Sequence, residues 1–128
     1  MVTTQLAVTW RLSVDRGPDW MFVRLHPTAE GGIDASALAE RIWSVLDQNF
    51  TYRLVLELDQ LEVLQSYLIA QLVMLSKRIH SHSGLLRLCG LSPVNQEVLR
   101  ICRLDGCLQN YENRSSAVKG EHRPLQPR

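Results

Sequence analysis

The chain has 128 residues, the usual size of one globular domain, and 45% of them are hydrophobic, which excludes a disordered chain. The formal net charge of +1 excludes the strong overall field that draws proteins to nucleic acid or to an acidic membrane. No apolar run approaches the ~20 residues that span a bilayer, and the N-terminus lacks a signal-peptide pattern. We therefore expect a freestanding, cytoplasmic domain.

The first part of the chain predicts a β-hairpin followed by a helix. Residues 6–14 and 20–25 are rich in strand-forming side chains, and residues 15–19 between them have the chemistry of a turn. Residues 27–32 predict a second break, and Asp34 is a favourable N-cap for the helix that follows. The apolar positions of this helix recur at helical spacing and are Leu38, Ile42, Val45 and Leu46.

A buried strand and a second helix are predicted next. Residues 53–58 are nearly continuously apolar, as expected for a strand that is covered on both faces. The second helix starts near Ser66. Its core-facing stripe has helical spacing and consists of Leu68, Leu72, Leu75 and Ile79. Gly84 is expected to cap this helix, before a further strand at residues 85–89.

A third helix is predicted from Ser92 and Pro93, a favourable N-cap followed by proline at the first helical position. Its inner face is expected to consist of Val94, Val98, Ile101 and Cys102. Gly106 is expected to end the helix, and residues 108–111 predict a short last strand.

The predicted order of elements is β-β-α-β-α-β-α-β. Strands that alternate with helices favour an α/β fold with a mixed, mostly parallel sheet. We expect about five strands and three main helices, with the hairpin as an antiparallel edge. These elements form one domain over residues 1–112, and the polar residues 113–128 predict a flexible tail.

The cysteines predict no metal site. The chain has an odd number of cysteines, which are Cys89, Cys102 and Cys107. Their spacing does not match the paired ligands of a zinc site. In a chain without a secretory signal, this composition indicates a reducing compartment. We expect Cys89 and Cys102 to lie in the core.

The charged side chains predict no catalytic site. Glu57, Asp59 and Glu62 are close in sequence and are expected to be solvated loop charges. His80 and His82 are expected at a solvated helix end. Because no set of side chains converges for chemistry, we expect neither an enzyme nor a cofactor. A small-ligand carrier or an enzyme is the alternative that a deep pocket with converging polar groups would favour.

Three segments carry a family resemblance. Residues 54–64 form a strand and a loop before a helix, residues 88–94 join a strand to the Ser-Pro helix start, and residues 99–108 are the Leu-rich end of that helix. With the order of elements over about residues 5–112, these segments resemble the STAS family, the fold of bacterial anti-sigma factor antagonists. The resemblance implies a non-enzymatic interaction module that binds a kinase-type anti-sigma factor.

In that family the second helix opens with Asp-Ser-Ser-Gly or Asp-Ser-Thr-Gly, and the partner kinase phosphorylates the first serine. The corresponding residues here are Gln65, Ser66, Tyr67 and Leu68, of which only the serine matches. The resemblance therefore implies that Ser66 is a candidate phosphorylation site at the positive end of a helix. Two alternatives stay open: Ser66 is only an N-cap, or the chain is a STAS scaffold or adaptor that works without phosphorylation.

The second helix also has apolar residues outside its core stripe. Such a helix either presents a binding face or is covered by neighbouring helices. With the residues around the serine, these positions form the candidate partner-binding surface: Gln65, Ser66, Tyr67, Ile69, Ala70, Val73 and Met74.

Overall fold

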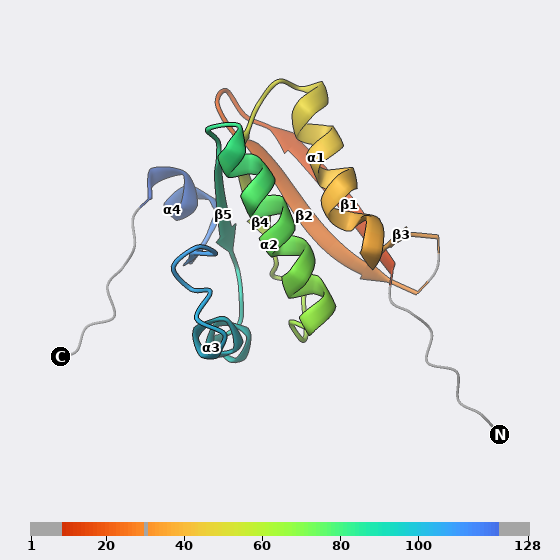
Figure 1. Cartoon of the computed structure of the whole chain (residues 1–128), viewed down its shortest axis with the longest axis vertical. Helices are drawn as coiled ribbons and strands as arrows, with labels where there is room; N and C mark the ends of the chain where they lie inside the picture. The colour runs from red at the N-terminus through yellow and green to blue at the C-terminus, as the bar shows by residue number, and fades with distance from the viewer. Residues whose placement is uncertain (1–8, 30, 121–128) are drawn as a thin grey trace.

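The computed structural model of the chain describes residues 9–29 and 31–120, which form a six-stranded sheet with helices on both faces (Figure 1). The strands are β1 (Thr9–Arg16), β2 (Met21–Thr28), β3 (Ile33–Asp34), β4 (Arg53–Glu57), β5 (Leu85–Cys89) and β6 (Asn110–Tyr111). The helices are α1 (Leu38–Gln48), α2 (Ser66–Ser81), α3 (Pro93–Ile101) and α4 (Arg114–Lys119), and a 3-10 turn, η1 (Ala35–Ala37), precedes α1.

The sheet is mixed and mostly parallel, with the strand order β3-β1-β2-β4-β5-β6. β1 pairs antiparallel with β2 and β3, whereas β4 is parallel to both β2 and β5, and β5 is parallel to β6. Each parallel connection contains a helix, because parallel neighbours need a crossover. The predicted fold class is confirmed, and the two-residue strand β3 is an addition to it.

The first face of the sheet carries the main core, which α1 and α2 cover side by side (Figure 1). The predicted stripe of α2 is buried, since each of its residues is at most 1% exposed: Leu68, Leu72, Leu75 and Ile79. Leu54 and Leu56 of β4 face the same core and are 0% exposed. Burial of apolar surface stabilises the folded state by about 25 cal/mol per Å². Because the larger of the two buried clusters lies on this face, this layer contributes most to the stability of the domain.

Strand β2 continues through a residue that the sequence predicted as a break. β1 and β2 pair along their full lengths, and Pro27 lies within β2, opposite Trp10. Proline has no N–H and is tolerated where one side of a strand is unpaired. β4 pairs with β2 only over residues 21–24, so Pro27 has no strand partner on that side within the described ranges. Residues 6–8 of the predicted first strand lie outside the described residues.

The second face of the sheet carries a smaller core. Val55 and Cys89 point to this face because successive side chains of a strand alternate. They are buried with Trp20, Tyr111 and Ala117. Two guanidinium groups contact the Trp20 ring, with the guanidinium carbons of Arg53 and Arg87 at 5.9 and 5.3 Å from the ring centroid. The central strands are therefore covered on both faces, as predicted.

Helix α4 covers this second core and corrects the prediction of a flexible tail, which is wrong for residues 114–119. Asn113 is the N-cap, and its side chain accepts a hydrogen bond of 2.9 Å from the Ser116 N–H. Arg87 donates to the carbonyl of Ala117 near the other end of the helix, at 2.8 Å. The rest of the predicted tail, residues 121–128, lies outside the described residues.

Three helices end in a left-handed residue that is not glycine. Phe50, Ser83 and Arg103 follow the C-caps of α1, α2 and α3 and have φ of 52°, 59° and 59°. Main-chain hydrogen bonds of the Schellman type run from the left-handed residue and from its successor back to the last turn. The left-handed conformation costs such residues about 1–2 kcal/mol.

Neither of the two glycines predicted to end helices is the left-handed residue that follows its helix. The left-handed residue after α2 is Ser83, and Gly84 is required by close packing, since a Cβ there would lie 2.1 Å from the Tyr52 carbonyl oxygen. α3 ends at Ile101, and a Cβ on Gly106 would meet nothing within 4 Å. Both predictions therefore named the wrong residue as the end of the helix.

Helix α3 buries a different face from the predicted one. Ser92 and Pro93 start it as expected. Val94 and Ile101 are 71% and 67% exposed. Cys102 is also exposed, so its prediction as a core residue is wrong, while the prediction for Cys89 is confirmed. Only Val98 of the predicted inner face packs partly against the core.

Candidate functional site

The candidate switch residue lies where the loop after β4 enters α2, at the carboxyl end of the parallel strands (Figure 1). Ser66 is the first residue of α2 and is exposed. The N-cap is Gln65, in extended conformation with φ −86° and ψ 159°, and it makes no side-chain cap hydrogen bond. The interpretation of Ser66 as an N-cap is therefore wrong.

The Ser66 hydroxyl is available for chemistry or binding. Within residues 9–29 and 31–120, no hydrogen bond or ion pair involves its side chain. Its main-chain N–H belongs to the first turn of α2, where the helix dipole favours negative charge. The exposed hydroxyl thus lies at the positive end of a 16-residue helix.

The loop before Ser66 is held by the side chain of Asn95, which is 0% exposed and lies on α3. Its Oδ1 accepts a hydrogen bond from the Leu64 N–H at 2.9 Å. Its Nδ2 donates to the carbonyls of Leu61 and Glu62, each at 3.4 Å. Asn95 thereby connects the start of α3 to the loop that leads into α2, a role that no local sequence pattern indicates.

The loops after β4 and β5 pack against each other. Gly90 has φ 82°, and a Cβ there would lie 3.0 Å from the Asp59 Cβ. The Leu58 N–H donates to the Cys89 carbonyl at 2.9 Å. Only glycine combines this conformation with this approach at low cost. The sequence element that joins β5 to α3 therefore also supports the loop that leads to Ser66.

Glu57 ends β4 and is 4% exposed, so its prediction as a solvated loop charge is wrong. Arg114 donates two hydrogen bonds to its carboxylate, at 2.8 and 2.9 Å, and a third to Asp15 at 3.1 Å. Arg24 lies 3.6 Å from Glu57 and donates to Asp59 at 3.0 Å. The buried carboxylate is thus neutralised by arginines from α4 and β2.

These charges also act on the thiol of Cys89. Burial, with the nearby Glu57 and Asp59 carboxylates, raises the pKa of Cys89 to about 12. The thiolate is the nucleophile and the metal ligand in cysteine chemistry. Cys89 therefore stays protonated and inert at neutral pH, in agreement with its expected place in the core.

The candidate partner-binding residues divide into two sets. Gln65, Ser66 and Ala70 are exposed, as are Tyr67 at 39% and Met74 at 57%. The remaining two candidates, Ile69 and Val73, pack partly against the main core. Five of the candidates are therefore accessible to a partner, while Ile69 and Val73 also support the fold.

Three further exposed apolar side chains lie in the elements that Asn95 joins. They are Val63, 58% exposed in the loop, and Val94 and Ile101 on α3. Periodicity predicted Val94 and Ile101 as core residues of α3, whereas Val63 lies in a loop without a periodic pattern. The apolar surface at this end of the sheet is therefore wider than α2 alone.

The three histidines within the described ranges, His26, His80 and His82, do not come together in one site. His26 bonds the Ser13 hydroxyl at 2.7 Å on the hairpin, and His82 packs against the rings of Trp43 and Tyr52 at 4.5 and 5.4 Å. No group of three His, Cys, Asp or Glu side chains in the described part of the chain is placed to hold a metal ion.

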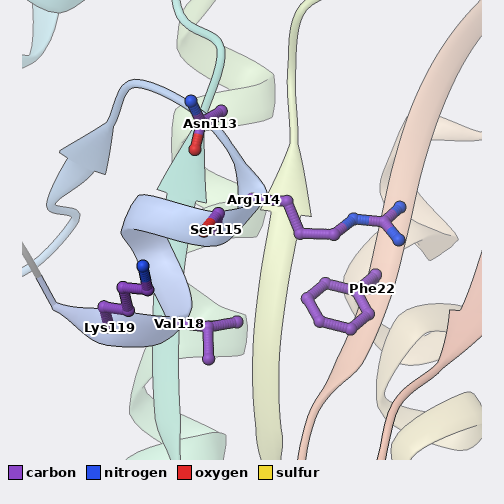
Figure 2. Close-up of a pocket in the computed structure, with 6 residues that line it drawn as sticks. All are labelled: Phe22, Asn113, Arg114, Ser115, Val118 and Lys119. Atoms are coloured by element: carbon purple, nitrogen blue, oxygen red, sulfur yellow. The ribbon is translucent and has the colours of Figure 1, made fainter.

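A shallow hollow of about 510 Å³ lies on the second face, between α4 and β2 (Figure 2). Phe22 and Val118 face each other across it, and the Arg114 side chain reaches over from α4 with its guanidinium carbon 4.3 Å from the Phe22 ring centroid. Arg114 is already paired with Glu57 and Asp15. The Arg114 guanidinium is therefore engaged in the fold and is not free to hold a ligand in this hollow.

No helix within the described ranges combines the length and the apolar character that crossing a bilayer requires.

Comparisons with known proteins give one family and one fold. The STAS domain profile matches residues 32–117 of the chain. No curated protein sequence matches the chain significantly. The solved structures with similar folds include a serine-to-glutamate variant of RsbS from Moorella thermoacetica, with 17% sequence identity and a TM-score of 0.72, which covers 86% of this chain and 93% of that chain.

Two further solved structures agree with this result. An anti-sigma factor antagonist from Mycobacterium paratuberculosis is 20% identical with a TM-score of 0.69, over 88% of this chain and 93% of that chain. The phosphorylated form of the Bacillus cell fate determinant SpoIIAA is 12% identical with a TM-score of 0.62, over 88% of this chain and 100% of that chain. At these identities the shared property is the fold.

Proposed function

The chain belongs to the STAS domain family, and on that premise we propose that it is a non-enzymatic, cytoplasmic antagonist of an anti-sigma factor. The observation that supports the proposal is the Ser66 hydroxyl at the start of α2, which is exposed and has no hydrogen bond among the described residues. The sequence resemblance aligns this residue with the family's switch serine. The proposed partner is an anti-sigma factor with serine kinase activity, which docks around Ser66 and phosphorylates it.

Phosphorylation at this position changes the surface and leaves the fold intact. A phosphate adds about −1.5 to −2 charges at pH 7. The first turn of a helix favours negative charge by about 0.3–1 kcal/mol, so α2 tolerates the modification. A partner surface packed against Ser66 and Tyr67 has to desolvate that charge, which weakens binding. The phosphate thus releases the partner.

The experiment incubates the protein with ATP and the kinase-type anti-sigma factor of the same organism, and locates phosphate by mass spectrometry. We expect one phosphate, on Ser66, and none on Ser66→Ala. In a binding assay Ser66→Asp is expected to weaken binding, while Ser66→Ala binds like the parent. Ser36→Asp is the matched control, because Ser36 is an exposed serine in the turn before α1. Phosphate elsewhere, or an equal effect of both aspartates, contradicts the phosphorylation switch.

One observation favours a second function, a STAS scaffold or adaptor that uses the same surface without phosphorylation. Leu68 occupies the family's glycine position and is 1% exposed in the main core, so the main chain there lacks the freedom of glycine. Tyr67 directly follows the serine and is 39% exposed, so a kinase that reaches Ser66 has to accommodate its ring. Equal partner binding by Ser66→Ala, Ser66→Asp and the parent supports the scaffold.

A further inference from the structure

We propose that Asn95 is a positioning residue for the Ser66 site: its three hydrogen bonds to the loop before α2 fix where that helix begins and so where the Ser66 side chain lies. The inference rests on the proposed function for the role of Ser66. The geometric claim, that Asn95 fixes this helix start, depends only on the contacts between α3 and the loop.

The loop is held from two sides. The side chains of Leu61 and Leu64 are 7% and 3% exposed and belong to the main core. Their main chain faces α3, where the Asn95 amide binds the Leu64 N–H and the carbonyls of Leu61 and Glu62. A buried main-chain group without a partner is strongly unfavourable. The side chains therefore anchor the loop, and Asn95 fixes the direction of its main chain.

The chemistry of asparagine is needed at this position. The loop presents one donor and two acceptors to α3, and the amide supplies one acceptor oxygen and two N–H donors. Leucine has a similar volume but leaves all three groups unpaired. Aspartate still accepts from the Leu64 N–H but places its charge against two carbonyl oxygens. Asn95 itself donates its main-chain N–H to the Ser92 hydroxyl at 3.2 Å, so its own place in the first turn of α3 is also fixed.

The hydrogen bonds act directly beside the helix start. Gln65 follows Leu64, and its carbonyl accepts hydrogen bonds from the N–H groups of Leu68 and Ile69, each at 3.0 Å. The first turn of α2 thus begins one residue after the main-chain group that Asn95 holds. Without Asn95 the loop can change direction, and the helix start moves or frays.

The test uses a thiol at the switch position. The starting chain carries Ser66→Cys with the two exposed cysteines replaced, Cys102→Ser and Cys107→Ser, while buried Cys89 is left in place. The rate of alkylation by iodoacetamide against pH gives the pKa of the introduced thiol. A thiol at an ordered helix start has a pKa below its ordinary value of about 8.5, because the helix N-terminus stabilises the thiolate.

Asn95→Ala is expected to return that pKa towards about 8.5, and to raise hydrogen exchange at the Leu64 amide by roughly tenfold or more, the factor for a lost buried hydrogen bond. Leu99→Ala is the matched control, because Leu99 is 2% exposed on the same helix and makes no hydrogen bond to the loop through its side chain. Circular dichroism and denaturation establish that each variant is folded under the conditions used.

The outcomes separate positioning from general stability. If Asn95→Ala leaves both the thiol pKa and Leu64 exchange at the starting values, or if Leu99→Ala shifts them equally, the proposal is overturned. If Asn95→Ala does not fold, Asn95→Asp takes its place in the test. This variant keeps the acceptor for the Leu64 N–H and loses both donors to the carbonyls. An unchanged thiol pKa in Asn95→Asp also overturns the proposal. No kinase enters this experiment, so a failure to phosphorylate Ser66 refutes the proposed function alone.

Discussion

Replacing Arg114 with methionine tests how much the second face of the sheet depends on one ion pair. The change removes two hydrogen bonds to Glu57 and one to Asp15, and leaves a carboxylate that is 4% exposed. Breaking a fully buried pair costs about 3–5 kcal/mol. The Arg114 side chain is 38% exposed and Arg24 stays 3.6 Å from Glu57, so screening reduces this cost to about 2 kcal/mol.

The assay is urea denaturation of four proteins: the parent, Arg114→Met, Glu57→Leu and the double variant. Because the double variant leaves no unpaired buried charge, we expect it to be more stable than Arg114→Met, with a coupling energy of about 2 kcal/mol. Arg100→Met is the control, since Arg100 and Glu97 form an exposed pair whose loss is not expected to change stability measurably. Additive single effects would refute the reasoning that the pair acts as a buried unit.

Three further predictions concern single residues. Phe50 is 84% exposed and has a left-handed main chain, so Phe50→Gly is expected to raise the free energy of unfolding in urea by about 0.5–1 kcal/mol. Phe50→Ala keeps a Cβ at this position and is expected to leave the free energy of unfolding unchanged. Because the pKa of Cys89 is raised in the folded protein, the unfolded protein releases this proton first as the pH rises. The free energy of unfolding is therefore unaffected below pH 9 and falls towards pH 12, by up to about 1.4 kcal/mol per pH unit. Cys89→Ala is expected to reduce this alkaline loss of stability in denaturation at pH 8–11. Ser66→Ala removes no cap hydrogen bond and is expected to change the free energy of unfolding by less than about 0.5 kcal/mol; a loss of 1 kcal/mol or more would indicate a cap after all.

Elements defined by local patterns could be predicted from the sequence. The stripe of α2, the apolar run of β4 and the Ser92-Pro93 helix start all depend on residues within one or two turns of each other. The parallel sheet then follows from the alternation of strands and helices. The position of Ser66 could also be predicted, because the elements on both sides of it were assigned correctly.

The errors arise where distant residues decide the outcome. Glu57 is buried because Arg114, 57 residues further along the chain, neutralises it. The side chain of Asn95 points inward, where it pairs with main-chain groups of the loop before α2. With Asn95 on the inner face of α3, the apolar side chains of Val94 and Ile101 face solvent. Periodicity alone assigns apolar residues to the interior, so the most informative polar residue of the site was not found.

The short strand β3 has a consequence for how the molecule meets other chains. β3 pairs only with Thr9 and Trp10, so among the described residues no strand pairs with the outer side of β1 from residue 11 to 16, which is an edge of the sheet. Such edges are templates on which a second chain can add a strand and start aggregation. Here the edge carries Arg11, Asp15 and Arg16, charges of the kind that natural edge strands use against such pairing. Neutralising these side chains would turn the free edge of the hairpin into a surface prone to polymerisation.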